Sequence, residues 1–316
     1  MKDTILFGDC KDTLKTIDSK VQMCVTSPPY YGLRDYGGEE NQIGQENTPE
    51  EYINNLVEVF REVRNILSDD GVLWVNIGDS YYNYRPGKGQ GLVKQSVSKT
   101  NQDLPTKCNR RANKLEGLKE KDLIGIPWML AFALRSDGWY LRQDIIWHKP
   151  NPMPESVKDR CTKSHEYIFL LSKNKKYYYD NEAIKEPVKQ DWGTRDRTKG
   201  KYHNSGTGLS PHSGLSKSYD RKNKRSVWSV TNKPYKDAHF AVYPPDLIEP
   251  CILAGSKEGD IILDPFMGSG TTGMVAKKLG RHYIGCELHE SYAEIIDKRV
   301  PVDKPVHNAL TMALNM

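Results

Sequence analysis

The chain has 316 residues, with 46 Lys and Arg against 41 Asp and Glu and a formal net charge of +5 at pH 7. Its hydrophobic residues, 37% of the total, suffice for one sizeable core or for one domain with an appendage. The longest apolar run, residues 128–134, is far shorter than the roughly 20 residues of a membrane span, and the acidic Asp3 stands where a secretory signal would be basic.

The cysteines are scattered and form no Cys-x-x-Cys pair. The pattern therefore predicts neither a zinc site nor a disulfide framework, and no metal cofactor is expected. Reduced thiols are therefore the default, and they are typical of a cytoplasmic protein. The six residues are Cys10, Cys24, Cys108, Cys161, Cys251 and Cys286.

Short apolar runs alternate with segments of helical periodicity along most of the chain, and no internal repeat is present. This alternation predicts an α/β fold with a parallel or mixed sheet covered by helices on both faces. Strands are expected at residues 4–7, 21–26, 72–77, 139–147, 167–171, 261–263 and 282–286, and helices from residue 48 and at 122–134, 245–254, 271–279 and 291–299.

The second strand runs into Ser27-Pro28-Pro29-Tyr30, called here the proline turn. Two prolines fix φ at successive positions and remove two N–H donors, so the segment is rigid. The Ser27 hydroxyl and the Pro28 carbonyl can then accept hydrogen bonds from an exocyclic amine, while the Tyr30 ring stacks on a flat base. On these residues alone, a proline-stiffened loop with a packing tyrosine fits as well.

The clearest helix begins at Thr48, which stands as an N-cap before Pro49 and forms a capping box with Glu51. Apolar residues recur at helical spacing as far as Leu67. The segment Asp69-Asp70-Gly71 is expected to end the helix.

The charge is distributed unevenly along the chain. Residues 82–121 carry a net of +7 and residues 173–236 a net of +10, which leaves −12 on the remainder. Both basic segments are rich in Gly, Ser and Asn and lack apolar periodicity, which is typical of long loops. They are either solvated loops or a surface that neutralises phosphates, and the aromatic residues among the basic ones favour nucleic acid. The aromatic residues are Trp192, Tyr202, Tyr219, Trp228 and Tyr235.

A second binding pattern follows the strand at 261–263. Residues 264–271, called here the glycine turn, carry Gly268 and Gly270 immediately before a helix, where backbone can approach a ligand and amides favour an anion. Glu287 ends the next strand, 17 residues after Gly270, where an acid can hold ribose hydroxyls. S-adenosylmethionine (AdoMet) suits such a site. The alternative is a purely structural one, a tight turn beside an acidic surface residue.

The two turns together resemble the DNA amino-methyltransferase family. The match extends to Phe7-Gly8-Asp9, 71–81 (GVLWVNIGDSY), 145–154 (IIWHKPNPMP) and 239–247 (HFAVYPPDL). With the catalytic motif first and the AdoMet motif last, the order is similar to the family's β arrangement.

This resemblance implies a Rossmann-like class I AdoMet-dependent methyltransferase sheet with helices on both faces and basic, loop-rich insertions. Residues 1–172 and 237–300 would form the catalytic and AdoMet-binding domain, with 82–121 as an insertion. Residues 173–236 would be the target recognition region, and 301–316 a C-terminal tail.

The resemblance also carries site residues onto this chain. The catalytic set is Ser27, Pro28, Pro29 and Tyr30. The cofactor-binding set is Asp9, Asp264, Pro265, Phe266, Gly268, Gly270, Thr271 and Glu287, with Asp9 near the adenine and Glu287 at the ribose. Phe240 and Pro244 are weaker candidates for closing that pocket.

Serine at the first position of the proline turn resembles the cytosine-N4 enzymes, whereas adenine-N6 enzymes usually carry Asp or Asn there. We therefore predict methyl transfer from AdoMet to N4 of a cytosine flipped out of duplex DNA. Lys149, Arg160 and Lys163 are predicted to hold flanking phosphates. Asp35 and Asp79 are candidate acceptors of the released proton.

Three alternatives stay open: an adenine-N6 DNA methyltransferase, a methyltransferase of RNA or of a protein amide, and a non-catalytic DNA-binding protein. Double-stranded DNA is the predicted partner, and no membrane is expected. The resemblance implies the cytoplasm of a prokaryotic or virus-infected cell. Dimerisation occurs in the family, although no feature here demands it. A companion restriction endonuclease, in a restriction-modification system, is also left open.

Overall fold

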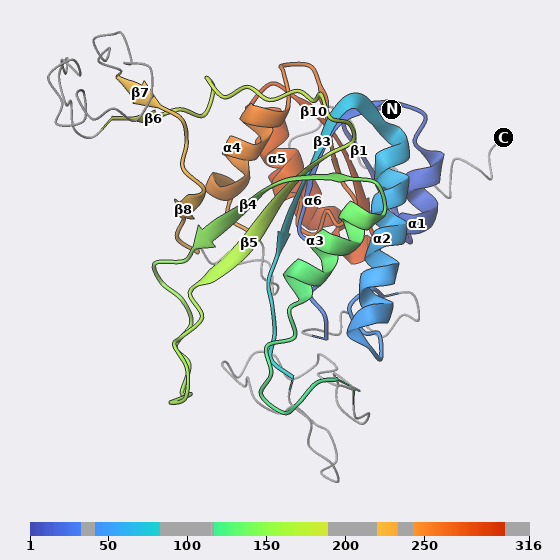
Figure 1. The fold of residues 1–316 in the computed structure, drawn as a ribbon. Helices are drawn as coiled ribbons and strands as arrows, with labels where there is room; N and C mark the ends of the chain where they lie inside the picture. Colours follow the sequence, from blue (N-terminus) through green and yellow to red (C-terminus); the bar gives the residue numbers. More distant parts are fainter. Residues whose placement is uncertain (33–41, 83–114, 116, 189–219, 233–242, 301–316) are drawn as a thin grey trace, which may run out of the picture. The chain divides into compact units, whose positions relative to one another are not determined.

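A computed structural model describes residues 1–32, 42–82, 115, 117–188, 220–232 and 243–300 (Figure 1). The chain divides into two compact units, one of Met1–Tyr179 with Ser226–Met316 and one of Asp180–Arg225. The smaller unit falls within the 173–236 segment but is shorter at both ends. Its described part contains a two-stranded antiparallel pair, β6 (Glu186–Pro187) with β7 (Arg221–Lys222).

The larger unit is built on an eight-stranded sheet of order β1-β10-β9-β2-β3-β5-β4-β8. The first five of these neighbours run parallel, and β5 is antiparallel to both β3 and β4. The strands are β1 (Thr4–Phe7), β2 (Val21–Thr26), β3 (Leu67–Ile77), β4 (Tyr140–His148), β5 (His165–Ser172), β8 (Val227–Ser229), β9 (Ile261–Asp264) and β10 (His282–Glu287).

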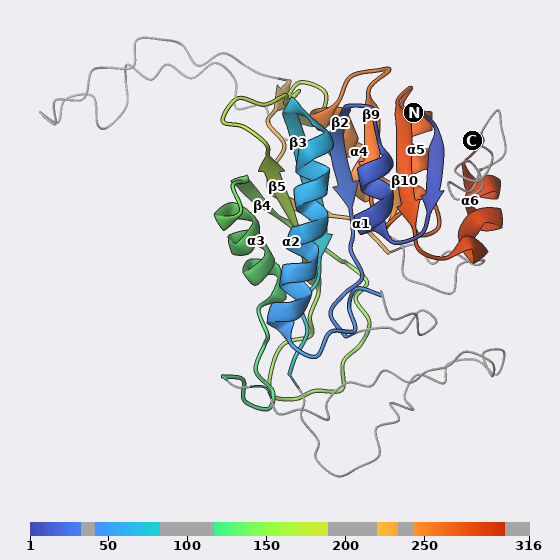
Figure 2. The same ribbon diagram turned by 90° about the vertical axis from the view of Figure 1, so that its right-hand side faces the viewer.

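Helices cover both faces of this sheet, with α1, α2 and α3 on one face and α4 and α5 on the other (Figures 1 and 2). The helices are α1 (Cys10–Thr13), α2 (Pro49–Ile66), α3 (Ile126–Ser136), α4 (Pro245–Gly255), α5 (Thr271–Lys278) and α6 (Ala293–Arg299). Both faces are therefore buried, which is why central strands such as β3 are apolar without alternation. No helix in the described ranges has the length and apolar character needed to cross a membrane.

The main core lies between the sheet and helices α1 to α3. There Leu73 and Val75 of β3 pack with Leu56 and Phe60 of α2. Trp74, between them in the strand, points to the other face, where it approaches Gly255 at the end of α4.

The predicted strands and helices are all present, and the capping box of α2 is confirmed: Thr48 Oγ1 accepts from Glu51 N at 3.1 Å and Glu51 returns a bond. The expected end of this helix is wrong. The helix stops at Ile66, β3 starts at Leu67, and Asp69-Asp70-Gly71 lies inside that strand.

The reason is long-range pairing. The carbonyls of Asp69, Asp70 and Gly71 accept hydrogen bonds from Asn174, Tyr178 and Lys173, which follow β5. The backbone is therefore satisfied as a strand. Helix α3 also starts later than predicted, at Ile126, since Gly125 adopts φ +87 immediately before it.

Several predictions concern residues outside the described ranges. These include most of 82–121, much of 173–236, the 301–316 tail, the start of the 239–247 motif, and the candidates Asp35 and Phe240.

Candidate active site

The parallel strands bring the two predicted turns to one edge of the sheet. β2 pairs with β9, so the proline turn that follows β2 lies beside the glycine turn that follows β9. β10 and β1 are the next strands along, and their carboxyl ends carry Glu287 and Asp9. We call this edge, where β1, β2, β9 and β10 end and β5 begins, the carboxyl edge.

Asp264 ties the two turns together. Its Oδ1 accepts from Thr26 Oγ1 at 2.5 Å and from the Phe266 amide at 3.0 Å, while its Oδ2 accepts from the hydroxyls of Thr272 at 2.5 Å and Tyr243 at 3.0 Å. Burial raises the pKa of this carboxyl, and the four hydrogen bonds oppose the shift. Its acceptor capacity is filled from within the protein, so Asp264 shapes the site rather than facing a ligand.

The glycine turn has an open face. Gly268 and Gly270 have φ of +52 and +82, which glycine adopts without strain. A Cβ on Gly268 would come no nearer to another atom than 4.0 Å, whereas one on Gly270 would lie 3.0 Å from Val300. Gly270 is therefore required by packing, and Gly268 leaves room for a bound group.

Glu287, at the end of β10, is hydrogen-bonded to the same glycine turn. Its Oε2 accepts from Gly268 N at 2.8 Å and its Oε1 from His289 N at 3.1 Å. Burial raises the pKa of this carboxyl to about 7, against the lowering effect of the two amides. Each oxygen still has acceptor capacity for a ligand hydroxyl.

Asp9 joins this group from β1. The Gly8 amide donates to the Glu287 carbonyl at 2.9 Å, which fixes the start of the segment. The Asp9 side chain accepts from Lys11 N at 2.8 Å and caps α1.

These residues suit AdoMet. The open face at Gly268 gives room for its amino-acid part, and Glu287 offers acceptors for ribose hydroxyls. Thr271 adds a buried hydroxyl that has no hydrogen-bond partner in the described part of the chain. Pro265 and Phe266 belong to the same turn, and Phe266 is partly buried against the core.

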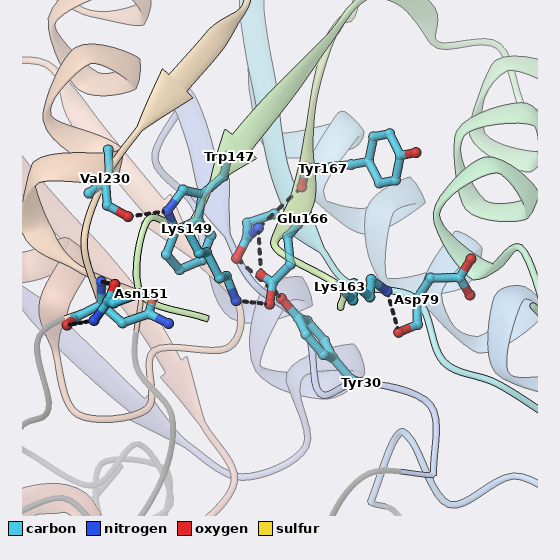
Figure 3. Close-up of polar contacts among 11 residues, drawn as sticks. Tyr30, Asp79, Trp147, Lys149, Asn151, Lys163, Glu166, Tyr167 and Val230 are labelled. Atoms are coloured by element: carbon cyan, nitrogen blue, oxygen red, sulfur yellow. Dashed lines mark hydrogen bonds and ion pairs between the residues drawn. The ribbon is translucent and has the colours of Figure 1, made fainter. Parts of the chain in front are cut away.

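The proline turn is fixed by hydrogen bonds at two points. Tyr52 of α2 donates to the Pro29 carbonyl at 2.8 Å. The Tyr30 hydroxyl donates to Glu166 Oε2 at 2.6 Å and lies 3.3 Å from Asn76 Oδ1 (Figure 3). Burial and Glu166 raise the pKa of Tyr30 well above its usual value, whereas the Ser27 hydroxyl lowers it.

Comparison with known proteins shows which family has this arrangement of turns. A family model described as DNA methylase, for the N6 and N4 methyltransferases, matches residues 21–298. The chain belongs to this DNA methylase family.

The methylase is 48% identical over 302 residues to the type II methyltransferase M.SmaI of Serratia marcescens, a match that covers 94% of this chain and 90% of that protein. Its fold is similar to that of the cytosine-N4-specific PvuII DNA methyltransferase, with a TM-score of 0.62 at 16% identity over 99% of this chain and 91% of that one. A complex of M1.HpyAVI with SAM gives a TM-score of 0.56 at 17% identity, over 95% and 99%. The predicted class, an AdoMet-dependent methyltransferase fold, is confirmed.

The Tyr30 ring of the methylase lies against the backbone of Gly78, where a Cβ would come within 2.7 Å of Tyr30 Cε2. Its position is thus set by Gly78 and by the bond to Glu166. Stacking of this ring on a base stays a prediction.

The three cations expected to hold phosphates are engaged within the methylase. Lys149 forms an ion pair with Glu166, Arg160 forms one with Glu155, and Lys163 donates to the Asp79 carbonyl at 2.6 Å. Burial also lowers the pKa of Lys163. This geometry gives the predicted phosphate contacts no support.

Asp79, a candidate proton acceptor, has a structural role instead. Its carboxylate accepts from the amides of Gly125 at 3.0 Å and Ile126 at 3.1 Å, and so caps α3. Within the described ranges, His, Cys, Asp and Glu side chains form no group that could hold a metal ion.

Three contributors to the site were missed. Glu166, Asn76 and Tyr243 lie on β5, on β3 and before α4, and each contacts a residue of one of the two turns. The run IIWHKPNPMP and its neighbours drew attention to Lys149, but no spacing in the sequence indicated that Glu166 is its partner.

Proposed function

We propose that the methylase transfers the methyl group of AdoMet to N4 of a cytosine flipped out of duplex DNA. The observation that carries this proposal is the 2.5 Å bond from Thr26 to Asp264. It joins the strand end that carries Ser27 to the turn that would hold AdoMet, so the amine and the methyl donor would meet between them.

The cofactor would be held by the glycine turn, by Glu287 at the ribose and by Asp9 towards the adenine. When bound, AdoMet supplies an electrophilic methyl group on a sulfonium. Glu287 and the Gly268 amide are bonded to each other, so the two sides of this pocket are fixed before a ligand arrives.

The proline turn would orient the amine. The exocyclic nitrogen of cytosine is a poor nucleophile because its lone pair is shared with the ring. The Ser27 hydroxyl and the Pro28 carbonyl would accept its two N–H groups, draw it towards sp³ geometry and aim the lone pair. The neighbouring Pro29 carbonyl is engaged by Tyr52, which holds the turn in place.

No carboxylate in the described structure contacts Ser27. We propose that the amine loses its proton to solvent after transfer, when it is cationic and acidic; the candidate acceptor Asp35 lies outside the described ranges. The choice of cytosine over adenine rests on Ser27 alone. Action on RNA, action on a protein amide and a non-catalytic protein are the alternatives. The experiment below distinguishes RNA and the non-catalytic protein from DNA methylation, and AdoMet binding without transfer to DNA or RNA would leave the protein amide. A companion endonuclease is suggested by the names of the type II relatives.

The test is transfer of labelled methyl from AdoMet to duplex DNA and to RNA of the same sequence, followed by digestion to nucleosides. We expect label in DNA as N4-methylcytosine, and a labelling rate about 10- to 100-fold lower with S27A. Label in N6-methyladenine, or in RNA only, would contradict the proposal. No transfer together with no AdoMet binding in calorimetry would favour a non-catalytic protein.

A further inference from the structure

Glu166 is a charged residue of the carboxyl edge that the reaction described above does not use. It lies at the start of β5, and its side chain is only 14% exposed. One oxygen accepts from the Tyr30 hydroxyl at 2.6 Å and from Asn76 Nδ2 at 3.2 Å, and the other pairs with Lys149 (Figure 3).

The partners of Glu166 converge on it from three parts of the fold. Tyr30 comes from the proline turn, Asn76 from β3 and Lys149 from the end of β4, and Gly78 leaves room for the Tyr30 ring beside the Glu166 Cγ. The Lys149 ammonium also lies 4.2 Å from the centre of the Trp147 ring, whose Nε1 donates to the Val230 carbonyl at 2.8 Å. The lysine is thus held in place from its far side.

The sheet does not need this carboxylate. The pairing of β5 with β3 and β4 is made by main-chain bonds, and Ile168, Phe169 and Leu171 provide its buried apolar contacts. A buried carboxylate is costly unless it is paired and hydrogen-bonded, so its presence calls for a role. Its contact nearest the reaction is the one with Tyr30.

We propose that Glu166 is a positioning residue, which acts through the Tyr30 hydroxyl to hold the proline turn in the geometry that receives the base. The ion pair with Lys149 keeps the Glu166 carboxylate ionised and in place. This inference rests on the proposed function. Asn76 supports the same oxygen, since its amide also donates to the Tyr167 carbonyl at 3.1 Å.

The variants Y30F, E166L and Y30F/E166L test the coupling. Each single change removes the same hydrogen bond, worth about 10- to 100-fold in rate for a bond to a charged group. We expect kcat to fall by this factor in Y30F and by at least this factor in E166L, which also leaves Lys149 without its partner, and the double variant should lose no more than E166L. The KM for AdoMet and its calorimetric Kd should stay within about twofold of the wild type, because the AdoMet pocket is untouched.

E166Q distinguishes the hydrogen bond from the charge. Its amide oxygen can still accept from Tyr30, whereas its NH₂ group faces Lys149, so we expect kcat between that of E166L and that of the wild type. Because E166Q keeps the size and polarity of the side chain, it can still be measured if E166L fails to fold.

D137N is the matched control. Asp137 is 12% exposed and pairs with Arg61 at 2.5 Å, but it precedes β4 and so lies at the opposite edge of the sheet. Its kcat should stay within about twofold of the wild type.

Multiplicative losses in Y30F/E166L, a parallel loss of AdoMet affinity, or an equal loss in D137N would overturn the role of Glu166. Failure of the proposed function gives a different result, because the wild type itself would then produce no N4-methylcytosine.

Discussion

Ser27 and Glu287 stand at the ends of β2 and β10 and would serve different events, the orientation of the amine and the binding of AdoMet. S27A should lower the rate of methyl transfer by about 10- to 100-fold and leave the AdoMet Kd within about twofold, since an orienting contact is lost. E287A should mainly weaken AdoMet binding. Steady-state kinetics with calorimetry separates the two. Losses that appeared only in AdoMet affinity for both variants would contradict these roles.

Glu287 should also make AdoMet binding depend on pH. Ribose hydroxyls donate best to an ionised carboxylate, and burial raises the pKa of this carboxyl to about 7. Affinity should therefore rise with pH and weaken below 7, by at most about tenfold per pH unit for one proton. Calorimetry between pH 6 and 8 measures this, with E287Q as the control. The same pH dependence in E287Q would exclude Glu287 as its source.

The site residues that could be predicted from the sequence are those that belong to a short, recognisable motif. Ser27 and Gly268 stand in short motifs next to strands. Glu166 could not be found in this way, because it meets Tyr30 across 136 positions of the chain and its neighbours in sequence carry no signal. Asp79 follows a strand, where a proton acceptor could lie, but only the fold shows that its carboxylate caps α3.

Among the elements, α2 is the one whose ends matter most to the site, since its Tyr52 holds the proline turn. T48A removes the cap that accepts from Glu51 N, and we expect the free energy of unfolding to fall by about 1 kcal/mol. Urea denaturation measures this. N54A, at an exposed position of the same helix, should leave stability unchanged or slightly higher. An equal loss in N54A would mean that the cap is not the cause.

Helices and strands could be predicted where periodicity or a cap marks them, as in α2. Their ends could not be predicted where residues far away in the sequence complete the hydrogen bonds. Asp69-Asp70-Gly71 has the chemistry of a turn, yet residues after β5 complete its hydrogen bonds as a strand. β8 was not expected at all, because three residues within a basic segment show no strand pattern until they pair with β4.

At the scale of the whole molecule, the modest net charge of +5 is a cancellation between an acidic remainder of −12 and segments of +7 and +10. If these segments contact DNA phosphates, log affinity should fall with log salt with a slope steeper than about −3. Fluorescence anisotropy of a labelled duplex measures it. K199Q/K201Q should make the slope shallower by up to about 2. A slope near zero would contradict a phosphate-binding surface.

Single-molecule sequencing of DNA from cells that express this methylase is the most direct test of the proposed methylation of cytosine at N4. We predict N4-methylcytosine at one short sequence context, with a smaller methylated fraction in cells that express S27A at the same level. N6-methyladenine at such a context, or no new modification, would contradict the account.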